Sequence, residues 1–330
     1  MADLSKTFIE FNDIIYLTND KKTDLRKSRA VIREDIVKYF NEKRDKHTVK
    51  FKGQGSLSMN TCILPLSGEY DVDDGVYIFG KEEDKPTVAT AHSWICDALN
   101  GKKIIDKNTC IRVICDNEYH VDLPIYYKTD KKENEFFWDD KDVPELAHKS
   151  KGWIESDPYE FKKWFEGKAK DKPQLKRIVR YLKAWSDNKS HLNLPSGMVF
   201  TILAANNYVV KDRDDEALLE TLKAIQQNID DTRFILASYV CKRPTVDKRE
   251  NLLAKYSADT RKKNFLDELN GFIESGKKAL ELKSKKDACA KWQKHLGERR
   301  FPCSNVVEDD ETLAKAFSHQ DVLRYDNKSA

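Results

Sequence analysis

The spacing of apolar residues predicts a long helix near the beginning of the chain. In residues 22–44, apolar side chains recur every three or four positions after a polar start. These positions are Leu25, Ile32, Ile36, Val37 and Phe40. One side of such a helix is apolar, so we expect it to pack against a neighbouring element.

The pattern then changes to short apolar or alternating runs, which predict strands. Between Val49 and Lys128, such runs are separated by Gly, Asn, Asp and charged residues that favour turns. The runs are CILPL (62–66), YDVDDGVYIF (70–79), TCIRVIC (109–115) and YHVDLPIYY (119–127). Between the second and third runs, residues 87–102 have helical spacing and end near Gly101, which predicts one helix packed across the sheet.

The second half of the chain has helical periodicity almost throughout. Residues 129–152 are polar and of mixed charge, which is typical of a long connection, and helical segments follow Asp157 and Pro158. Strands followed by helices predict an α+β protein. We place a first domain at residues 1–150 and a helical second domain at residues 151–330, with an active site in the cleft between them.

Composition indicates a folded protein with a charged but nearly neutral surface. Of 330 residues, 35% are charged, and 59 Lys and Arg against 56 Asp and Glu leave a net charge of +3. This balance argues against a protein whose whole surface binds polyanions, so any anion site must be local. We expect a monomer without a nucleic-acid activator.

The cysteines and the N-terminus predict a cytoplasmic location. The seven cysteines are scattered and include no C-x-x-C pair, so reduced thiols are expected. The first residues, MADLSKTFIEFNDIIYL, lack the basic start and the unbroken apolar stretch of a signal peptide. No other window is apolar and long enough to predict a membrane span.

Three aspartates in two predicted strands are the strongest chemical signal. Asp71 and Asp73 stand two apart, and the period of two in a strand turns both carboxylates to the same face. Like charges so close repel each other unless a cation lies between them. Asp122 in the fourth run completes the set. Three carboxylates suit two Mg²⁺ ions, or Mn²⁺, which can bind a triphosphate and lower the pKa of an attacking hydroxyl.

Two other segments have features of a triphosphate site. In GQGSLS (53–58), two glycines let a phosphate approach the backbone, and Ser56 adds a hydroxyl donor. The predicted helix QLKRIVRYLKAWSDN (174–188) carries Lys176, Arg180 and Lys183 on the side opposite its apolar stripe. A solvated face explains Lys176 and Arg180 equally well, whereas Lys183 is the better triphosphate ligand.

Together these segments resemble one known family. The Gly-Ser turn GQGSLSMNT, the strand YDVDDGVYIF, the strand HVDLPIYY and the later LKAW helix are similar in order and spacing to the bacterial CD-NTases. These are the cGAS/DncV-like cyclic-oligonucleotide synthases of CBASS anti-phage systems. The likeness runs from about Phe51 to Asn251. It implies a polymerase-β-like nucleotidyltransferase core packed against a C-terminal helical lobe.

The resemblance also implies roles for individual residues. The catalytic and metal-binding residues would be Asp71, Asp73 and Asp122. The nucleotide-binding residues would be Gln54, Gly55, Ser56, Met59, Arg112, Lys183, Ser196 and Asp247. Arg112 would hold the acceptor nucleotide, although a structural ion pair explains it as well, and a surface turn explains Asp247 nearly as well. Met59 replaces an aromatic residue of some relatives, so the base preference stays open.

The family's chemistry implies an enzyme that joins nucleoside triphosphates and releases pyrophosphate. The substrates would be ATP and GTP or another nucleoside triphosphate, and the product a cyclic di- or trinucleotide resembling cyclic GMP-AMP. This second messenger would act on a separate effector protein in anti-phage defence. Attachment of the C-terminus at Ala330 to other molecules is a further expectation.

Two alternatives stay open on the sequence alone. A template-independent transferase that adds nucleotides to RNA or protein would use the same metal triad, but the nearly neutral surface disfavours RNA. A non-enzymatic nucleotide sensor would not need the three acids and Ser56. The motifs of a zinc deaminase and of a P-loop enzyme are absent from the sequence.

Overall fold

The computed structural model describes residues 2–116, 119–129, 143–236, 240–246, 250–254 and 259–308. The chain forms two compact units. The sheet unit consists of Tyr16–Arg180 and Val240–Leu253, and the helical unit of Met1–Ile15, Tyr181–Tyr239 and Ala254–Ala330. These bounds differ from the predicted division near residue 150, because the first helix belongs to the helical unit and residues 151–180 to the sheet unit.

A mixed sheet forms the centre of the sheet unit. Its strands are β1 (Thr48–Gln54), β2 (Tyr70–Gly80), β3 (Ile104–Asp106), β4 (Cys110–Asp116), β5 (Tyr119–Thr129), β6 (Glu145–His148) and β7 (Gly152–Glu155). The main order is β1-β2-β5-β4-β3, and β6 pairs with β5 and β7. β2 and β5 run parallel, whereas the other pairs are antiparallel. The parallel pair brings the two predicted acidic strands side by side.

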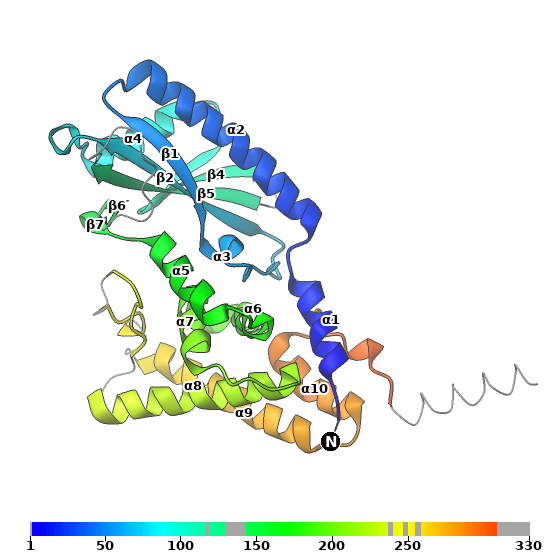
Figure 1. Ribbon diagram of the computed structural model, residues 1–330. Helices are drawn as coiled ribbons and strands as arrows, with labels where there is room; N and C mark the ends of the chain where they lie inside the picture. The colour runs from blue at the N-terminus through cyan, green and yellow to red at the C-terminus, as the bar shows by residue number, and fades with distance from the viewer. Residues whose placement is uncertain are drawn as a thin grey trace, which may run out of the picture. The chain divides into compact units, whose positions relative to one another are not determined.

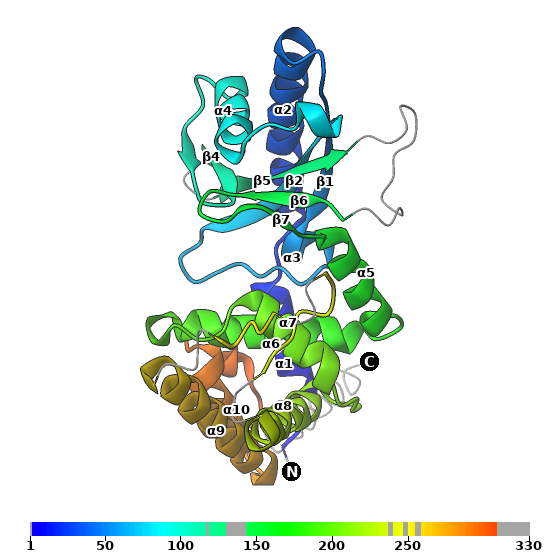
Figure 2. The ribbon, with the colours of Figure 1, turned by 90° about the vertical axis from the view of Figure 1, so that its left-hand side faces the viewer.

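Two helices, α2 (Asn19–Lys43) and α4 (Val88–Ala98), cover one face of this sheet (Figure 1). Figure 2 shows α2 running across the strands with α4 beside it. Alternate apolar residues of the central strands are buried in the core with apolar residues of these helices. On the strands they are Val72, Val76, Ile78, Val121, Leu123 and Ile125, and on the helices Leu25, Ile32, Ile36, Phe40, Ala91 and Ile95. Both helix predictions are confirmed, although Val37 is 37% exposed.

The remaining helices of the sheet unit are short or lie near its borders. They are α3 (Gly55–Ser58), the 3-10 helix η1 (Glu82–Asp84), α5 (Pro158–Ala169) and the first half of α6 (Pro173–Asn188). Asp157 caps α5 by accepting hydrogen bonds from the backbone of Tyr159 and Glu160, both at 2.9 Å. This cap fits the sequence, because a proline at the first helical position needs no hydrogen-bond partner for its nitrogen.

The prediction of a strand at CILPL is wrong. Residues 62–66 form a loop between α3 and β2. Pro65 cannot donate a hydrogen bond to a strand ladder, and its carbonyl instead accepts a bond from Gly68 N at 3.0 Å. Gly68 has a φ of +80°, as tight turns often require. Cys62 is buried although it is not in a strand, so burial rather than strand formation explains the apolar run.

A buried ion pair connects α2 to β2. Asp74 is fully buried and points to the opposite face from Asp71 and Asp73, because side chains alternate along a strand. Arg33 donates to both of its oxygens at 2.7 and 2.5 Å, and Arg29 Nη1 lies 3.9 Å away. A buried carboxylate without a partner would be strongly destabilising, so the pair fixes how α2 lies on the strand.

The helical unit confirms the helical character predicted for the second half of the chain. It contains α1 (Ser5–Ile15), the end of α6, η2 (Ser190–Leu192), α7 (Gly197–Asn207), α8 (Asp214–Leu236), α9 (Asp259–Glu281), α10 (Lys285–Leu296) and η4 (Cys303–Asn305). Its core is aromatic, since the ring of Phe8 contacts the rings of Tyr181, Trp292 and Phe301 edge to face. Among the described residues, no helix is both long and apolar enough to cross a bilayer.

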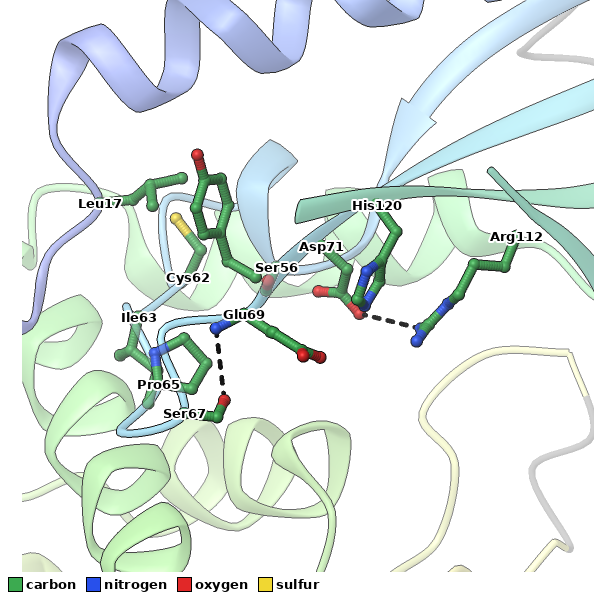
Figure 3. A pocket seen from close by; sticks show the side chains of 11 residues that line it. Leu17, Ser56, Cys62, Ile63, Pro65, Ser67, Glu69, Asp71, Arg112 and His120 are labelled. Carbon is green, nitrogen blue, oxygen red and sulfur yellow. Dashed lines mark hydrogen bonds and ion pairs between the residues drawn. The ribbon is translucent and has the colours of Figure 1, made fainter. Parts of the chain in front are cut away.

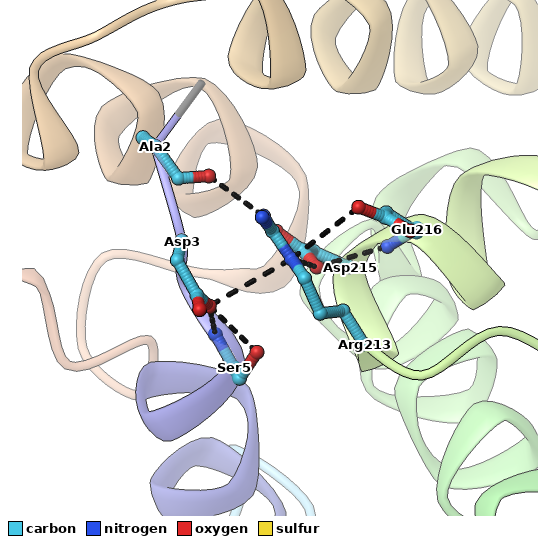
Figure 4. Close-up of polar contacts among 6 residues, drawn as sticks. All are labelled: Ala2, Asp3, Ser5, Arg213, Asp215 and Glu216. Carbon is cyan, nitrogen blue, oxygen red and sulfur yellow. Dashed lines mark hydrogen bonds and ion pairs between the residues drawn. The ribbon is translucent and has the colours of Figure 1, made fainter.

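The N-terminal segment is anchored to the start of α8 (Figure 4). Arg213 Nη2 donates to the carbonyl of Ala2 at 2.6 Å and, with Nε, to the two carboxylate oxygens of Asp215 at 2.5 and 3.0 Å. Asp215 is fully buried, and its hydrogen bonds raise the pKa of Arg213. Asp3 lies 3.7 Å from the same guanidinium. The first residues are therefore part of the helical unit's structure.

Two cysteines form a disulfide, so the expectation that all thiols are reduced is wrong. Cys289 on α10 is joined to Cys303, 14 residues later. After α10 the chain reverses at Gly297, where φ is +104° and the amide donates to Gln293 O at 2.8 Å. This turn returns Cys303 to the helix. The two cysteines are 14 residues apart and are not a C-x-x-C pair, so the pairing could not be predicted from the sequence.

Candidate functional site

Polar residues of β2 and β5 gather on the sheet face opposite α2 and α4. In the parallel register, Asp71 lies beside His120 and Asp73 beside Asp122. Paired residues of adjacent strands point to the same face, and the strands are about 4.8 Å apart. The structure therefore places the three predicted acids on one face of two neighbouring strands.

Arg112 compensates the charge of Asp122. Arg112 on β4 is paired with Asp122 on β5, and its Nε and Nη2 donate to the two carboxylate oxygens at 2.6 and 2.7 Å. Arg112 also lies 3.9 Å from the Asp71 carboxylate, and Lys107 Nζ lies 3.6 Å from Asp122. The bonds to Asp122 raise the pKa of Arg112. The structural ion pair, which was one of the two explanations of Arg112 from the sequence, is therefore present.

The three acids suit a divalent cation by their chemistry. Carboxylate oxygens are the hard ligands that Mg²⁺ and Mn²⁺ prefer. Within the described ranges, however, no three His, Cys, Asp or Glu side chains are grouped so that they could hold an ion as they stand. Asp122 is 8% exposed and bound to Arg112, whereas the Asp71 side chain is 51% exposed. Both oxygens of Asp122 already accept hydrogen bonds from Arg112, so an ion bound at Asp73 and Asp122 would share this carboxylate with the guanidinium or displace it.

The Gly-Ser turn lies directly beside Asp73. Gln54 at the end of β1 is paired with Asp73, and its Nε2 donates to the hydroxyl of Tyr126 at 3.1 Å. Gly55 has a φ of +68°, and a Cβ added there would lie 1.9 Å from Asp73 Oδ2. Only glycine fits this place, because it tolerates the positive φ and leaves room for the carboxylate. Ser56 follows in the first turn of α3.

A cavity of about 250 Å³ adjoins Asp71 (Figure 3). Its polar lining consists of Ser56, Ser67, Glu69, Asp71, Arg112 and His120. Burial, followed by the nearby Arg112, lowers the pKa of His120 below its ordinary value. His120 and Glu69 were missed in the sequence. The period of two in the strand could have identified His120, since it stands two residues before Asp122.

Lys183 and Ser196 lie close together in the helical unit. Ser196 is the exposed residue before α7, and Lys183 extends from α6 so that its Cε lies 3.1 Å from the Cβ position of Gly197. A cavity of about 320 Å³ is lined by Lys183, Ser186 and Gly197, among others. A lysine beside a helix N-terminus favours an anion. The two residues predicted to bind phosphate are thus neighbours.

Three other predicted positions have different outcomes. Arg180 is 7% exposed and donates to Asn60 O at 2.6 Å, so it does not belong to a solvated face. Its guanidinium also lies over the ring of Tyr16. Met59 is 6% exposed and follows α3 directly. Asp247 lies outside the described residues.

Comparison with known families gives a match over the same region. Residues 49–126 match the family described as cyclic GMP-AMP synthase DncV-like, nucleotidyltransferase domain. Over these residues the chain is similar to a DncV-like nucleotidyltransferase domain. The resemblance to the bacterial CD-NTases is confirmed, and the matched segment contains β1 from its second residue on, the Gly-Ser turn and all three acids. Nucleotidyltransferases of the DncV type generally depend on divalent metal ions.

Similar curated proteins are cyclic GMP-AMP synthases. The protein of Escherichia albertii is 32% identical over 205 residues, which cover 57% of this chain and 43% of that protein. The protein of Vibrio cholerae is 25% identical over 324 residues, which cover 82% of this chain and 71% of that protein. The match to the E. albertii protein therefore spans less than half of that protein's length.

Solved structures of Vibrio cholerae DncV, a cyclic AMP-GMP synthase, have the same fold. The complex with nonhydrolyzable GTP has a TM-score of 0.78 at 20% identity, covering 93% of this chain and 99% of that chain. The complex with the linear intermediate 5′ pppA(3′,5′)pG has a TM-score of 0.75, covering 93% and 98%. The α+β nucleotidyltransferase fold expected from the sequence is confirmed.

Proposed function

We propose that this chain is a metal-dependent nucleotidyltransferase that condenses nucleoside triphosphates into a cyclic di- or trinucleotide. A purine product of the cyclic GMP-AMP type, made from ATP and GTP, agrees with the names of the similar synthases. The observation that carries the proposal is the position of Asp71, Asp73 and Asp122 on neighbouring strands beside the Gly-Ser turn.

The residues of this face would have different roles in in-line phosphoryl transfer. Asp71, Asp73 and Asp122 would hold two Mg²⁺ ions, or Mn²⁺, which supply positive charge at the phosphates and lower the pKa of the attacking ribose hydroxyl. Gln54, Gly55 and Ser56 would contact the triphosphate through donors at the turn. All six residues belong to the sheet unit.

The bond changes follow from this arrangement. The ribose oxygen forms a bond to the α-phosphorus of a second nucleotide, the bond from that phosphorus to the bridging oxygen breaks, and pyrophosphate leaves. The hydroxyl proton passes to solvent. Arg112 would hold the acceptor nucleotide during this step. A second transfer within the linear product closes the ring.

The remaining roles are part of the same proposal. Lys183 and Ser196 would bind phosphate oxygens at the start of α7. The product would act on a separate effector protein in anti-phage defence, and the enzyme would be a cytoplasmic monomer. Conjugation through the C-terminus stays a prediction, and residues 309–330 lie outside the described residues.

The test is incubation of the purified protein with four labelled ribonucleoside triphosphates and Mg²⁺ or Mn²⁺. Products that resist phosphatase are then separated and identified by mass spectrometry. We expect a resistant cyclic nucleotide and pyrophosphate from the wild type, and none from Asp71→Asn or Asp73→Asn. Glu155→Gln on β7 serves as the matched control, because that acid is exposed and outside the site.

Three results would contradict the proposal. An unchanged yield in the aspartate variants would remove the metal triad from the mechanism. Label transferred to added RNA or to protein instead of a small product would favour the template-independent transferase. Nucleotide binding without product under either metal would favour the sensor.

A further inference from the structure

His120 stands in the same row of side chains as the predicted catalytic acids. It is two residues before Asp122 on β5 and is therefore on the same face of the sheet. Its partner across the parallel register is Asp71. The two side chains lie next to each other at the cavity, with Arg112 beyond them (Figure 3). Within the described part of the chain, the His120 ring forms no hydrogen bond.

The order of the strands places different residues on the two sides of Asp71. β2, which carries Asp71, lies between β1 and β5. The Gly-Ser turn follows β1, and Ser56 lines the cavity from that side. His120 on β5 lines it from the other side of Asp71. Because neighbouring strands are about 4.8 Å apart, the β1 side and the β5 side of the cavity are separated by roughly two strand spacings.

In-line transfer requires the donor and the acceptor nucleotide to lie on different sides of the cavity. The attacking hydroxyl and the leaving pyrophosphate lie on opposite sides of the α-phosphate. If the phosphate tail of the donor nucleotide is held at the Gly-Ser turn, the pyrophosphate leaves toward β1. The attacking nucleotide must then approach from the side of β5, where Asp122 and His120 lie.

We propose that His120 is a positioning residue for the acceptor nucleotide and forms a hydrogen bond with the ribose hydroxyl next to the attacking one. This inference rests on the proposed function and adds a residue to it. An imidazole nitrogen can donate to a hydroxyl or accept from it. The bond orients the sugar so that the other hydroxyl faces the acids, and His120 itself does not touch the reacting atoms.

The experiment separates the two nucleotide roles with substrates that can each fill only one. A 2′,3′-dideoxynucleoside triphosphate can only be the donor, because it has no hydroxyl with which to attack. An α,β-methylene nucleoside triphosphate can only be the acceptor, because its pyrophosphate cannot leave. Initial rates of the linear product, measured with each substrate varied in turn, give separate KM values for donor and acceptor.

His120→Ala should raise the KM of the acceptor about tenfold, the effect of one lost hydrogen bond, and change the KM of the donor less than about twofold. His120→Asn, which keeps a polar amide, should recover part of the loss. His148→Ala is the matched control, because His148 lies on β6, bonds to Asn108 and Ser150, and does not line the cavity. An acceptor that lacks the ribose hydroxyl next to the attacking one should show no further loss in His120→Ala.

The outcomes distinguish this inference from the proposed function. If the wild type forms product and His120→Ala leaves the acceptor KM unchanged, or raises both KM values equally, the inference is overturned. If the wild type forms no product, the proposed function fails, and equilibrium binding of the α,β-methylene nucleotide then decides. Weaker binding in His120→Ala than in His148→Ala supports the contact, and equal binding overturns it.

Discussion

Arg112 and Asp122 face each other across β4 and β5, and two hydrogen bonds of 2.6 and 2.7 Å join the guanidinium to both carboxylate oxygens. The pair explains how three acids can stand on two neighbouring strands of a folded sheet. Positive charge between like charges reduces their repulsion. The sequence suggested a metal ion for this purpose, whereas the structure shows that a side chain of the protein serves it as well.

We expect strong coupling between these two residues in stability. Arg112→Met should lower the free energy of unfolding by about 2 to 3 kcal/mol, because Asp122 is left nearly buried without its charged partner. Adding Asp122→Asn should restore about 2 kcal/mol, which urea unfolding of the two single variants and the double variant would measure. Lys107→Met is the control and should cost less than about 1 kcal/mol, because Lys107 is 36% exposed and 3.6 Å away. Additive single effects would contradict the coupling.

Gly55 should be essential for turnover. Gly55→Ala places a methyl group 1.9 Å from Asp73 Oδ2 at a φ of +68°, so the carboxylate must move. We expect kcat/KM for cyclic-nucleotide formation to fall at least about 100-fold, with a loss of stability of about 1 to 3 kcal/mol. Gly53→Ala is the matched control, since its methyl group meets only the end of the Arg29 side chain, at 2.9 Å. Equal activity of the two variants would show that Asp73 tolerates displacement.

His295 should make the protein less stable as the pH falls. Burial first, and then Lys189 and Lys294, lower its pKa from 6.5 to about 3 in the folded state. The unfolded chain therefore binds an extra proton between these values. The stability that the protein has with a neutral His295 is fully present above pH 6.5. As the pH falls from 6.5 toward 3, the free energy of unfolding decreases by up to about 1.4 kcal/mol per pH unit.

Urea unfolding between about pH 7 and about pH 5 measures this slope. His295→Gln should have a shallower pH dependence than the wild type, and exposed His191→Gln should not. Glu268 lies 3.8 Å from His295 Nδ1 but also 3.5 Å from Lys189, which explains why it does not stabilise the charged ring. Parallel slopes for wild type and His295→Gln would contradict the prediction.

The disulfide should stabilise the helical unit. Reduction of Cys289–Cys303 should lower the free energy of unfolding by about 3 kcal/mol, as expected for a loop of this length. Calorimetry with and without dithiothreitol would detect this as a lower Tm. Cys289→Ser with Cys303→Ser should not respond to the reductant, whereas Cys96→Ser should respond like the wild type. A wild type that does not respond would mean that the bond is not formed in solution.

Much of the fold could be predicted because its elements have clear periodicities. The period of two in YDVDDGVYIF and HVDLPIYY indicated both the strands and the shared face of the acids. The apolar spacing of residues 22–44 indicated α2. Such local patterns report which side of an element is buried, and that is sufficient to place Asp71, Asp73 and Asp122 on one side.

Contacts between residues that are distant in sequence could not be predicted. Arg180 is buried by its bond to Asn60, 120 positions earlier, and nothing near Arg180 indicates this partner. The same holds for Cys289 and Cys303, which meet only because the chain reverses at Gly297. A parallel pairing of β2 with β5 also cannot be read from either strand alone, so the neighbourhood of Asp71 and His120 required the structure.

The Asp74–Arg33 pair restricts where the chain can change length. A shift of β2 by one residue would turn Asp73 toward the helices and Asp74 toward the site. Such a shift would also separate Asp74 from Arg33 and leave a charge unpaired in the core. Insertions or deletions should therefore be tolerated in the loop of residues 62–68, yet be excluded between Asp71 and Asp74. The ion pair therefore limits which insertions and deletions β2 can accept during evolution.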